Sequence, residues 1–190
     1  MPVSSSARVR SAFAATGRTR FLPADQVAYA AADRPLPIGH GQTNSQPRTV
    51  ADMLTALDVR PGQRVLDVGS GSGWTTALLA WLVGPQGSVL GVERVPELVI
   101  QGRANLASLE RPWARIEAAR EGVLGWPQDA AYDRILVSAE ARRIPPALLE
   151  QLASDGLMVI PVHGHLLSVF ADGTSRDLGR YIFVPLIDPE

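Results

Sequence analysis

A glycine-rich turn between an apolar strand and an apolar helix restricts the fold of this chain more than any other feature. The stretch VLDVGSGSGW, residues 65–74, carries Gly69, Gly71 and Gly73 at the junction. Glycines let a ligand approach the main chain without interference from Cβ atoms, and a helix N-terminus offers free N–H groups at the same point. The turn alone is weak evidence, but it predicts a βαβ unit with a ligand site.

Beyond the turn, stretches of strand length alternate with stretches of helical period. Pro47 marks the start of a helix that VRPGQ ends after Leu57, and a short solvated helix is expected over residues 9–15. Strands are expected over 64–71, 88–94, 114–119, 133–139 and 156–162, helices over 74–84, 96–110 and 145–153, and a hairpin over 165–186. This order predicts an α/β fold with a mostly parallel sheet and a C-terminal antiparallel hairpin.

Length and composition limit the classes of function. The 190 residues suit one domain, divided into an N-terminal helical segment (1–34), a loop (35–46) and the sheet with its C-terminal strands (47–190). A formal charge of -1 gives no electrostatic reason to expect nucleic acid. The longest apolar run, ALLAWLV, is far shorter than the roughly 20 residues of a membrane span. A cytoplasmic monomer without a membrane partner is the expectation.

The chain offers little to a metal ion. It contains no cysteine, which excludes disulfides and thiolate ligands. His163 and His165 would share one face of a strand, but no further histidine or cysteine lies nearby. No metal site is expected.

Two acids narrow the identity of the ligand. Glu93 ends the strand that follows the turn, where a carboxylate would accept hydrogen bonds from the hydroxyls of a ribose. The spacing G-x-G-x-G, unlike the G-x-G-x-x-G of dinucleotide enzymes, suits a cofactor without a pyrophosphate. Asp67 would repel a diphosphate and attract a cation, which favours S-adenosylmethionine. Taken singly, Asp67 could instead cap loop amides and Glu93 could pair with Arg94.

Several segments resemble the protein-L-isoaspartate O-methyltransferase family in order and spacing. They run from about Phe21 to Leu186 and read DRPLPIGHGQTNSQP, VLDVGSGSGW, VLGVERVPEL, EGVLGWP, AYDRILVSAEA, LLEQLASDGLMVIPV and IFVPL. Many methyltransferases share the glycine turn, whereas PLPIG-GQT-SQP is specific to this family. The resemblance implies a Rossmann-like, doubly wound sheet with helices on both faces. It also implies methyl transfer from S-adenosylmethionine to the free carboxylate of L-isoaspartyl residues, with D-aspartyl residues as a further candidate substrate.

The same resemblance assigns the site. Ser45 matches the active-site serine, and Gln42, Thr43 and Asn44 complete the substrate loop. The implied cofactor residues are Asp67, Gly69, Ser70, Gly71, Gly73 and Glu93, with Glu121 and Gly122 at the adenine end. Mild side chains suffice, because a carboxylate is already ionised at neutral pH and a sulfonium carries its own leaving group. We expect Ser45 to orient the substrate carboxylate, with a helix N-cap as its alternative role.

The chain departs from the family pattern in several places, and two of them fall in the predicted site. Asn44 stands where an apolar residue is usual, and REG at 120–122 replaces the usual GDG. The main hypothesis is the first step in the repair of proteins and peptides that contain isoaspartate. The alternatives are an enzyme of the same chemistry dedicated to aspartate in one partner peptide, and a relative that binds S-adenosylmethionine without catalysis.

Overall fold

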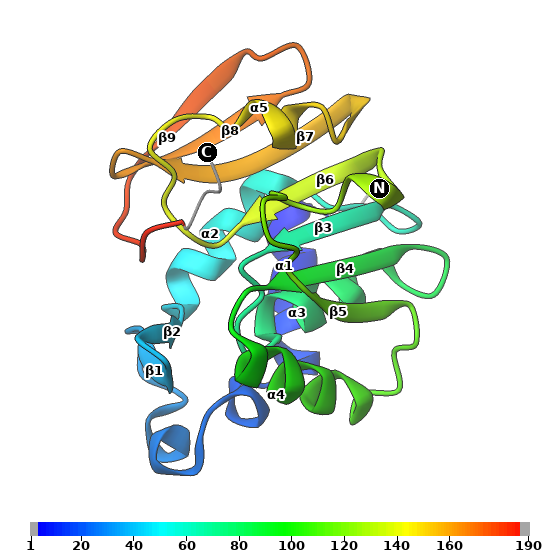
Figure 1. Ribbon diagram of the computed structural model, residues 1–190. Coiled ribbons are helices and arrows are strands. Elements are labelled where there is room, and N and C mark those ends of the chain that lie inside the picture. Colours follow the sequence, from blue (N-terminus) through cyan, green and yellow to red (C-terminus); the bar gives the residue numbers. More distant parts are fainter. Residues whose placement is uncertain (1–3, 187–190) are drawn as a thin grey trace.

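The protein, described over residues 4–186 by a computed structural model, is built on one seven-stranded sheet with a separate two-stranded hairpin (Figure 1). The strand order of the sheet is β5-β4-β3-β6-β7-β8-β9. Five strands run parallel: β3 (Arg64–Val68), β4 (Ser88–Glu93), β5 (Ala114–Ala118), β6 (Tyr132–Val137) and β7 (Leu152–Val162). The antiparallel strands β8 (His165–Phe170) and β9 (Ser175–Arg180) complete the edge. The predicted α/β fold is confirmed.

The order of the strands creates a crevice. The chain runs outward from β3 to β4 and β5, then returns to place β6 on the other side of β3. At such a switch point the loops leaving two neighbouring strands diverge, and ligands bind at the carboxyl ends of the strands. The loops after β3 and β6 meet here. The distance shows this, since a Cβ added to Gly69 would lie only 3.9 Å from the Cβ of Ser138.

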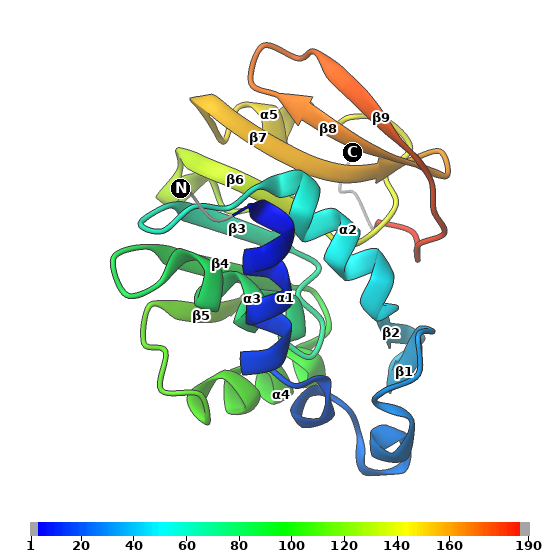
Figure 2. The ribbon, with the colours of Figure 1, turned by 180° about the vertical axis from the view of Figure 1, so that it is seen from behind.

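Helices cover the two faces unequally. On one face, α1 (Ser5–Ala15), α2 (Pro47–Leu57), α3 (Trp74–Val83) and α4 (Pro96–Ala107) share a core with the sheet. The other core contains the four-residue helix α5 (Pro146–Leu149) and the loops beside the 3-10 turn η3 (Pro127–Asp129). Figure 2, the view from behind, shows α1 lying over α3 with α2 alongside.

Helix α3 occupies the centre of the face that the four helices α1 to α4 cover. Nine of its ten residues are buried, which agrees with a sequence that is apolar all round. It lies between the sheet and α1, and the ring of Phe13 packs edge-on against Trp74 at 5.3 Å. Val9 and Ala12 of α1 are buried in the same core. The expectation of a solvated N-terminal helix was therefore wrong.

Two C-terminal elements also differ from expectation. The helix expected over 145–153 is only Pro146–Leu149, because Leu152 already pairs with Tyr132 in the sheet. The terminal hairpin ends at Arg180 instead of continuing to residue 186. The chain then crosses to the end of β6, where Glu140 N–H donates to Val184 O at 2.8 Å and Leu186 N–H donates to Glu140 O at 2.7 Å. Backbone pairing with Glu140 replaces pairing with β8.

The two neighbouring histidines lie apart from any ligand set. His163 has a φ of 49° in the turn between β7 and β8, so the two do not share a strand face as expected. His165 Nδ1 lies 2.8 Å from Asp177 Oδ2. Within residues 4–186, no group of three or more His, Cys, Asp or Glu side chains could hold a metal ion. No helix in that range has the length and apolar character needed to cross a membrane.

Candidate active site

One cavity lies at the carboxyl ends of the central strands and collects segments that are far apart in sequence. Its wall includes β2 (Gln42–Asn44) with Ser45, the glycine-rich turn, the end of β4, the loop after β5 and the end of β6. Val184, Pro185 and Leu186 close it from the C-terminal side. The predicted substrate loop and the predicted cofactor turn therefore face the same space.

The glycine-rich turn forms the floor with its main chain. Gly69, Gly71 and Gly73 have φ values of 79°, 53° and 91°, which side chains rarely tolerate. Gly69, Ser70 and Gly71 line the cavity. Gly73 does not: its missing side chain lets the turn pack on α4 and β5, since a Cβ would lie 3.0 Å from Ile116 Cδ1 and 3.3 Å from Gly102 O.

Glu93 joins the turn to the end of β4. Its Oε2 accepts a hydrogen bond from Gly71 N–H at 2.8 Å, and its Oε1 accepts from Arg94 N–H at 2.7 Å and Val95 N–H at 2.9 Å. The side chain is buried yet lines the cavity. A carboxylate oxygen can accept two hydrogen bonds, and among the described residues Oε2 accepts only the one from Gly71, so Glu93 retains capacity for a ligand hydroxyl.

Asp67 lies beneath the turn and does not line the cavity. It is fully buried, and its Oδ2 accepts hydrogen bonds from the hydroxyls of Thr75 at 2.7 Å and Thr76 at 2.6 Å. Burial raises the pKa of Asp67 to about 6, the two threonine hydroxyls lower it, and the charge of Glu93 raises it. Asp67 thus holds the first turn of α3, and its assignment to the cofactor stays a prediction.

Two serine hydroxyls in the cavity wall lack partners. Ser70 Oγ and Ser138 Oγ are buried and have no hydrogen bond to any described residue. Buried polar atoms are normally satisfied. Together with Glu93 and the glycine floor, these hydroxyls fit a polar ligand such as the amino acid and ribose parts of S-adenosylmethionine.

The substrate loop is carried by the hairpin of β1 (Leu36–Gly39) and β2 (Gln42–Asn44), which projects beyond α2 (Figures 1 and 2). Gln42, Thr43, Asn44 and Ser45 all line the cavity.

Ser45 does not cap α2. Gln46 is the N-cap residue, and Arg48 N–H instead donates to Asp33 Oδ1 at 2.9 Å. The N-cap alternative for Ser45 was wrong, because Asp33 from the N-terminal segment supplies that oxygen. Among the described residues no hydrogen bond engages Ser45 Oγ, so the hydroxyl is available to a substrate.

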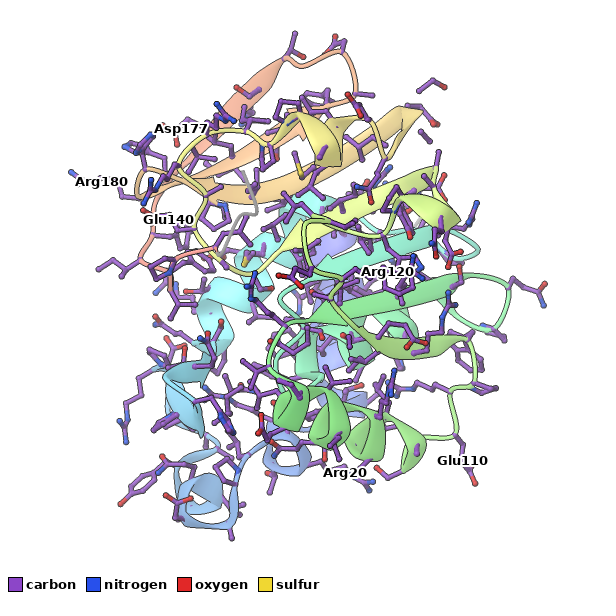
Figure 3. All side chains as sticks on the ribbon, viewed as in Figure 1. Arg20, Glu110, Arg120, Glu140, Asp177 and Arg180 are labelled. Atoms are coloured by element: carbon purple, nitrogen blue, oxygen red, sulfur yellow. The ribbon has the colours of Figure 1, made fainter. Side chains whose placement is uncertain are left out.

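The adenine end differs in detail from the assignment. Glu121 and Gly122 lie in an exposed turn outside the cavity wall, whereas Ala119, Arg120 and Leu124 line it. The Arg120 guanidinium stacks 4.5 Å from the ring centre of Trp126. In Figure 3 the labelled Arg120 lies over β4 and β5, and Glu140 lies on the side of β8 and β9. Contact of Glu121 and Gly122 with a cofactor stays a prediction.

Sequence reasoning missed several residues of the site. Ser138 lies within the segment AYDRILVSAEA but was given no role there, although its place at the end of β6, beside the glycine turn, follows from the strand order. Arg18 is buried directly behind the substrate loop. No periodicity or motif could have separated Arg18 from the exposed arginines around it.

Comparisons with known proteins agree with this arrangement. Residues 2–189 match the family model described as Protein-L-isoaspartate(D-aspartate) O-methyltransferase (PCMT). A protein-L-isoaspartate O-methyltransferase of Anaeromyxobacter dehalogenans is 53% identical over 189 residues, with 94% of this chain and 88% of the relative covered. One from Aeropyrum pernix is 45% identical over 190 residues, with 96% and 73% covered.

A solved structure shares the fold. A crystal structure of a protein-L-isoaspartate O-methyltransferase from Plasmodium falciparum, in complex with S-adenosyl-L-homocysteine, aligns with a TM-score of 0.83. It covers 94% of this chain and 89% of its own, at 25% sequence identity. The family match over nearly the whole chain and the identity of the relatives lead to one conclusion: this chain belongs to the protein-L-isoaspartate(D-aspartate) O-methyltransferase family.

Proposed function

We propose that this protein transfers a methyl group from S-adenosylmethionine to the free carboxylate of L-isoaspartyl residues in proteins and peptides, the first step of their repair. The observation that carries the proposal is one cavity shared by the loop Gln42–Ser45 and the turn Gly69–Gly71 with Glu93. A methyl donor bound on the turn would face a substrate held by the loop. Family membership makes the chain an S-adenosylmethionine-dependent methyltransferase.

The chemistry requires alignment more than acid–base catalysis. A substrate carboxylate oxygen forms a bond to the methyl carbon as the carbon–sulfur bond breaks and its electron pair passes to sulfur. The carboxylate is ionised at neutral pH, so no residue must remove a proton. Holding the reacting atoms in line and excluding water can lower the barrier by about 7–11 kcal/mol.

Ser45 is assigned to orient the substrate carboxylate. Its hydroxyl lies in the cavity wall and is not used by α2. A neutral donor can direct a carboxylate without holding it as strongly as a full charge would. Thr43 and Gln42 shape the same wall, and Val184–Leu186 screen the opposite side from water.

No observation now favours the dedicated-peptide alternative. It rested on Asn44 as an extra polar group facing the substrate. Asn44 is buried, and its amide group is already hydrogen-bonded to Arg18 and Ser72.

The test is base-labile methyl incorporation from labelled S-adenosylmethionine into matched peptides that carry L-isoaspartate, L-aspartate or D-aspartate at one position. We expect labelling of the isoaspartyl peptide, loss of turnover in Ser45→Ala with cofactor binding retained, and full activity in Ser88→Ala, at the opposite end of β4. An enzyme that binds the cofactor and labels none of the three peptides would overturn the proposal.

A further inference from the structure

Arg18 is a buried cation placed directly behind the substrate loop. It follows α1 in the 3-10 turn η1 (Arg18–Phe21), and its exposed fraction is 6%. The guanidinium lies 5.4 Å from the ring centre of Trp74, the first residue of α3. Burial lowers the pKa of Arg18 to about 10, so the side chain stays charged at neutral pH. A buried charge needs a built set of partners.

Those partners are the backbone of the loop that carries Ser45. Arg18 Nη2 donates to Asn44 O at 2.8 Å, to Ser45 O at 2.9 Å and to Arg34 O at 2.9 Å. Nη1 donates to Ala32 O at 3.0 Å. One planar group therefore fixes both the start of the hairpin and the carbonyls on either side of the Ser45 amide.

Asn44 extends this contact to the cofactor turn. Its Oδ1 accepts from Arg18 Nε at 2.8 Å, and its Nδ2 donates to Ser72 Oγ at 3.4 Å. Ser72 belongs to the glycine-rich turn, and its carbonyl accepts from Asn105 Nδ2 of α4 at 2.8 Å. A continuous buried path of hydrogen bonds thus runs from Arg18 through Asn44 to Ser72.

We propose that Arg18 and Asn44 are positioning residues that hold Ser45 in register with the cofactor turn. Neither is assigned to touch the reacting atoms. Arg18 fixes the position of the loop by binding the carbonyls of Asn44 and Ser45. Asn44 fixes the distance between the loop and the cofactor turn by its hydrogen bond to Ser72. Because alignment supplies the catalysis, loosening this path lowers methyl transfer while the cofactor floor itself stays intact. This inference rests on the proposed function.

Arg111 provides a matched control. It is also a partly buried arginine that ties the N-terminal segment to the core, donating to Thr16 Oγ1 at 2.9 Å and Ala77 O at 2.8 Å. Its partners lie at the joint of α1 and α3, and none belongs to the substrate loop. Arg111→Met therefore reports the effect of a looser N-terminal segment alone.

The experiment compares wild type, Arg18→Met, Asn44→Leu, the double variant and Arg111→Met. It measures kcat and KM for an isoaspartyl peptide, the affinity for S-adenosylhomocysteine by calorimetry, and hydrogen exchange over residues 42–46. We expect Arg18→Met and Asn44→Leu to lower kcat/KM by about 10- to 100-fold, the scale of a misplacement of roughly 1 Å. Exchange in the loop should become faster, and S-adenosylhomocysteine affinity should stay near wild type.

The double variant separates positioning from general damage. If the two residues form one path, its kcat/KM should resemble that of the worse single variant instead of the product of both losses. Should Arg18→Met not fold, Arg18→Lys and Asn44→Leu carry the test, because each removes only some of the hydrogen bonds that hold the loop.

Two results would overturn the inference. One is wild-type kcat/KM and wild-type loop exchange in folded Arg18 and Asn44 variants. The other is an equal loss of kcat/KM in Arg111→Met. A wild-type protein inactive on every peptide would instead refute the proposed function, and the exchange data would still decide whether Arg18 orders the loop.

Discussion

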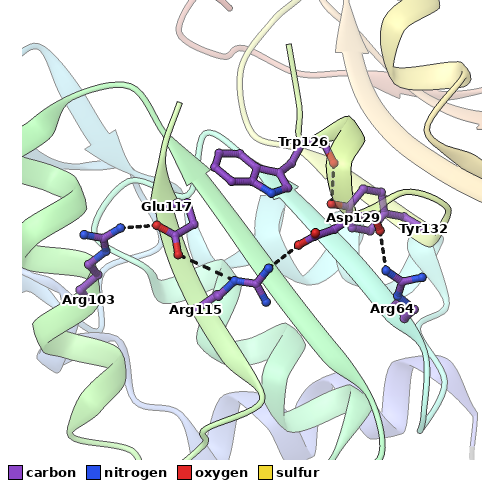
Figure 4. Close-up of polar contacts among 7 residues, drawn as sticks. All are labelled: Arg64, Arg103, Arg115, Glu117, Trp126, Asp129 and Tyr132. Atoms are coloured by element: carbon purple, nitrogen blue, oxygen red, sulfur yellow. Dashed lines mark hydrogen bonds and ion pairs between the residues drawn. The ribbon is translucent and has the colours of Figure 1, made fainter. Parts of the chain in front are cut away.

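Arg18 and Arg115 each contact several oxygen atoms. Arg18 is buried inside the molecule, whereas Arg115 lies on its surface. Arg18, 6% exposed, binds four carbonyls and an amide oxygen behind the substrate loop. Arg115 lies on β5 with half of its side chain exposed, and it pairs with Glu117 and Asp129. Figure 4 shows this second set as a chain from Arg103 through Glu117 and Arg115 to Asp129.

The difference teaches that burial, not the number of charges, decides what a charged contact is worth. Water competes for exposed ion pairs, which contribute about 0–1 kcal/mol. Water cannot reach the acceptors around a buried cation, so removing the cation leaves those acceptors unpaired. The chain of four charged side chains on β5 and its neighbours should therefore matter less than Arg18 alone.

Arg18→Met should give the largest effect on stability. Four buried or half-buried carbonyls lose their donor, and leaving several such acceptors unpaired should lower the free energy of unfolding by about 3–5 kcal/mol. Urea unfolding followed by tryptophan fluorescence measures this. A loss below about 1 kcal/mol would place Arg18 with the surface pairs and break the comparison.

A buried acid gives the second effect, through pH. The folded-state pKa of Asp67, raised by burial to about 6, lies above the unfolded value of 3.8, so its protonated form favours folding. That contribution is complete below the unfolded pKa and is lost as pH rises through about 6. Relative to Asp67→Asn, wild type should lose about 3 kcal/mol of unfolding free energy from about pH 3 to about pH 7.

Asp33 supplies a control of opposite sign for that experiment. The N–H of Arg48 and the amide of Gln46 hold the pKa of this exposed carboxylate below its usual value. Wild type should therefore gain stability relative to Asp33→Asn as pH rises through the acid range. Parallel slopes for the two variants would contradict the assignment of Asp67 as a destabilised buried charge.

Glu93 and Glu117 extend the comparison to ligand binding, with an intermediate effect. Glu93 is buried and bound to three N–H groups at the cavity, whereas Glu117 lies in the surface chain. We expect Glu93→Gln to weaken S-adenosylhomocysteine binding by about 10- to 100-fold, the scale of one charged hydrogen bond. Glu117→Gln should leave that affinity unchanged in the same calorimetric titration.

Arg115→Gln should give the smallest effect. It removes the centre of the surface chain, and we expect the free energy of unfolding to change by at most about 1 kcal/mol. The change should shrink further when salt is raised, because exposed pairs are screened. A loss of unfolding free energy that persists at high salt would show that this series of ion pairs stabilises β5 more than its exposure predicts.

The fold was largely predictable because local sequence patterns, such as apolar periodicity, glycine turns and helix-starting prolines, determine most of its elements. The glycine turn, Glu93 at the end of β4 and the helix from Pro47 were expected within a few residues. Errors arose where a distant partner decided the outcome. Gln151 closes the short α5 by hydrogen bonds to Leu124 O and Ala147 O. Asp33, 15 residues before the Arg48 whose N–H it accepts, replaces Ser45 at the start of α2.

The site was half predictable for the same reason. The family resemblance located Gln42–Ser45 and the turn, and the structure brings both to one cavity. Ser138 and Val184–Leu186 lie in segments that resemble the family, but nothing local assigned a role to them or to Arg18, since their roles follow from contacts made after folding. The roles assigned to Ser45, Glu121 and the other site residues stay predictions.

The last crossing of the chain, from Arg180 to Leu186, has a consequence for biosynthesis. Arg18, which lies behind the substrate loop, is synthesised long before Val184–Leu186, which close the cavity. A nascent chain can form the glycine turn early, yet it holds an open, wet crevice until residue 186 has docked on Glu140. A chain synthesised only as far as Arg180 would therefore lack one wall of the site, and methyl transfer would have to wait until Val184–Leu186 had docked.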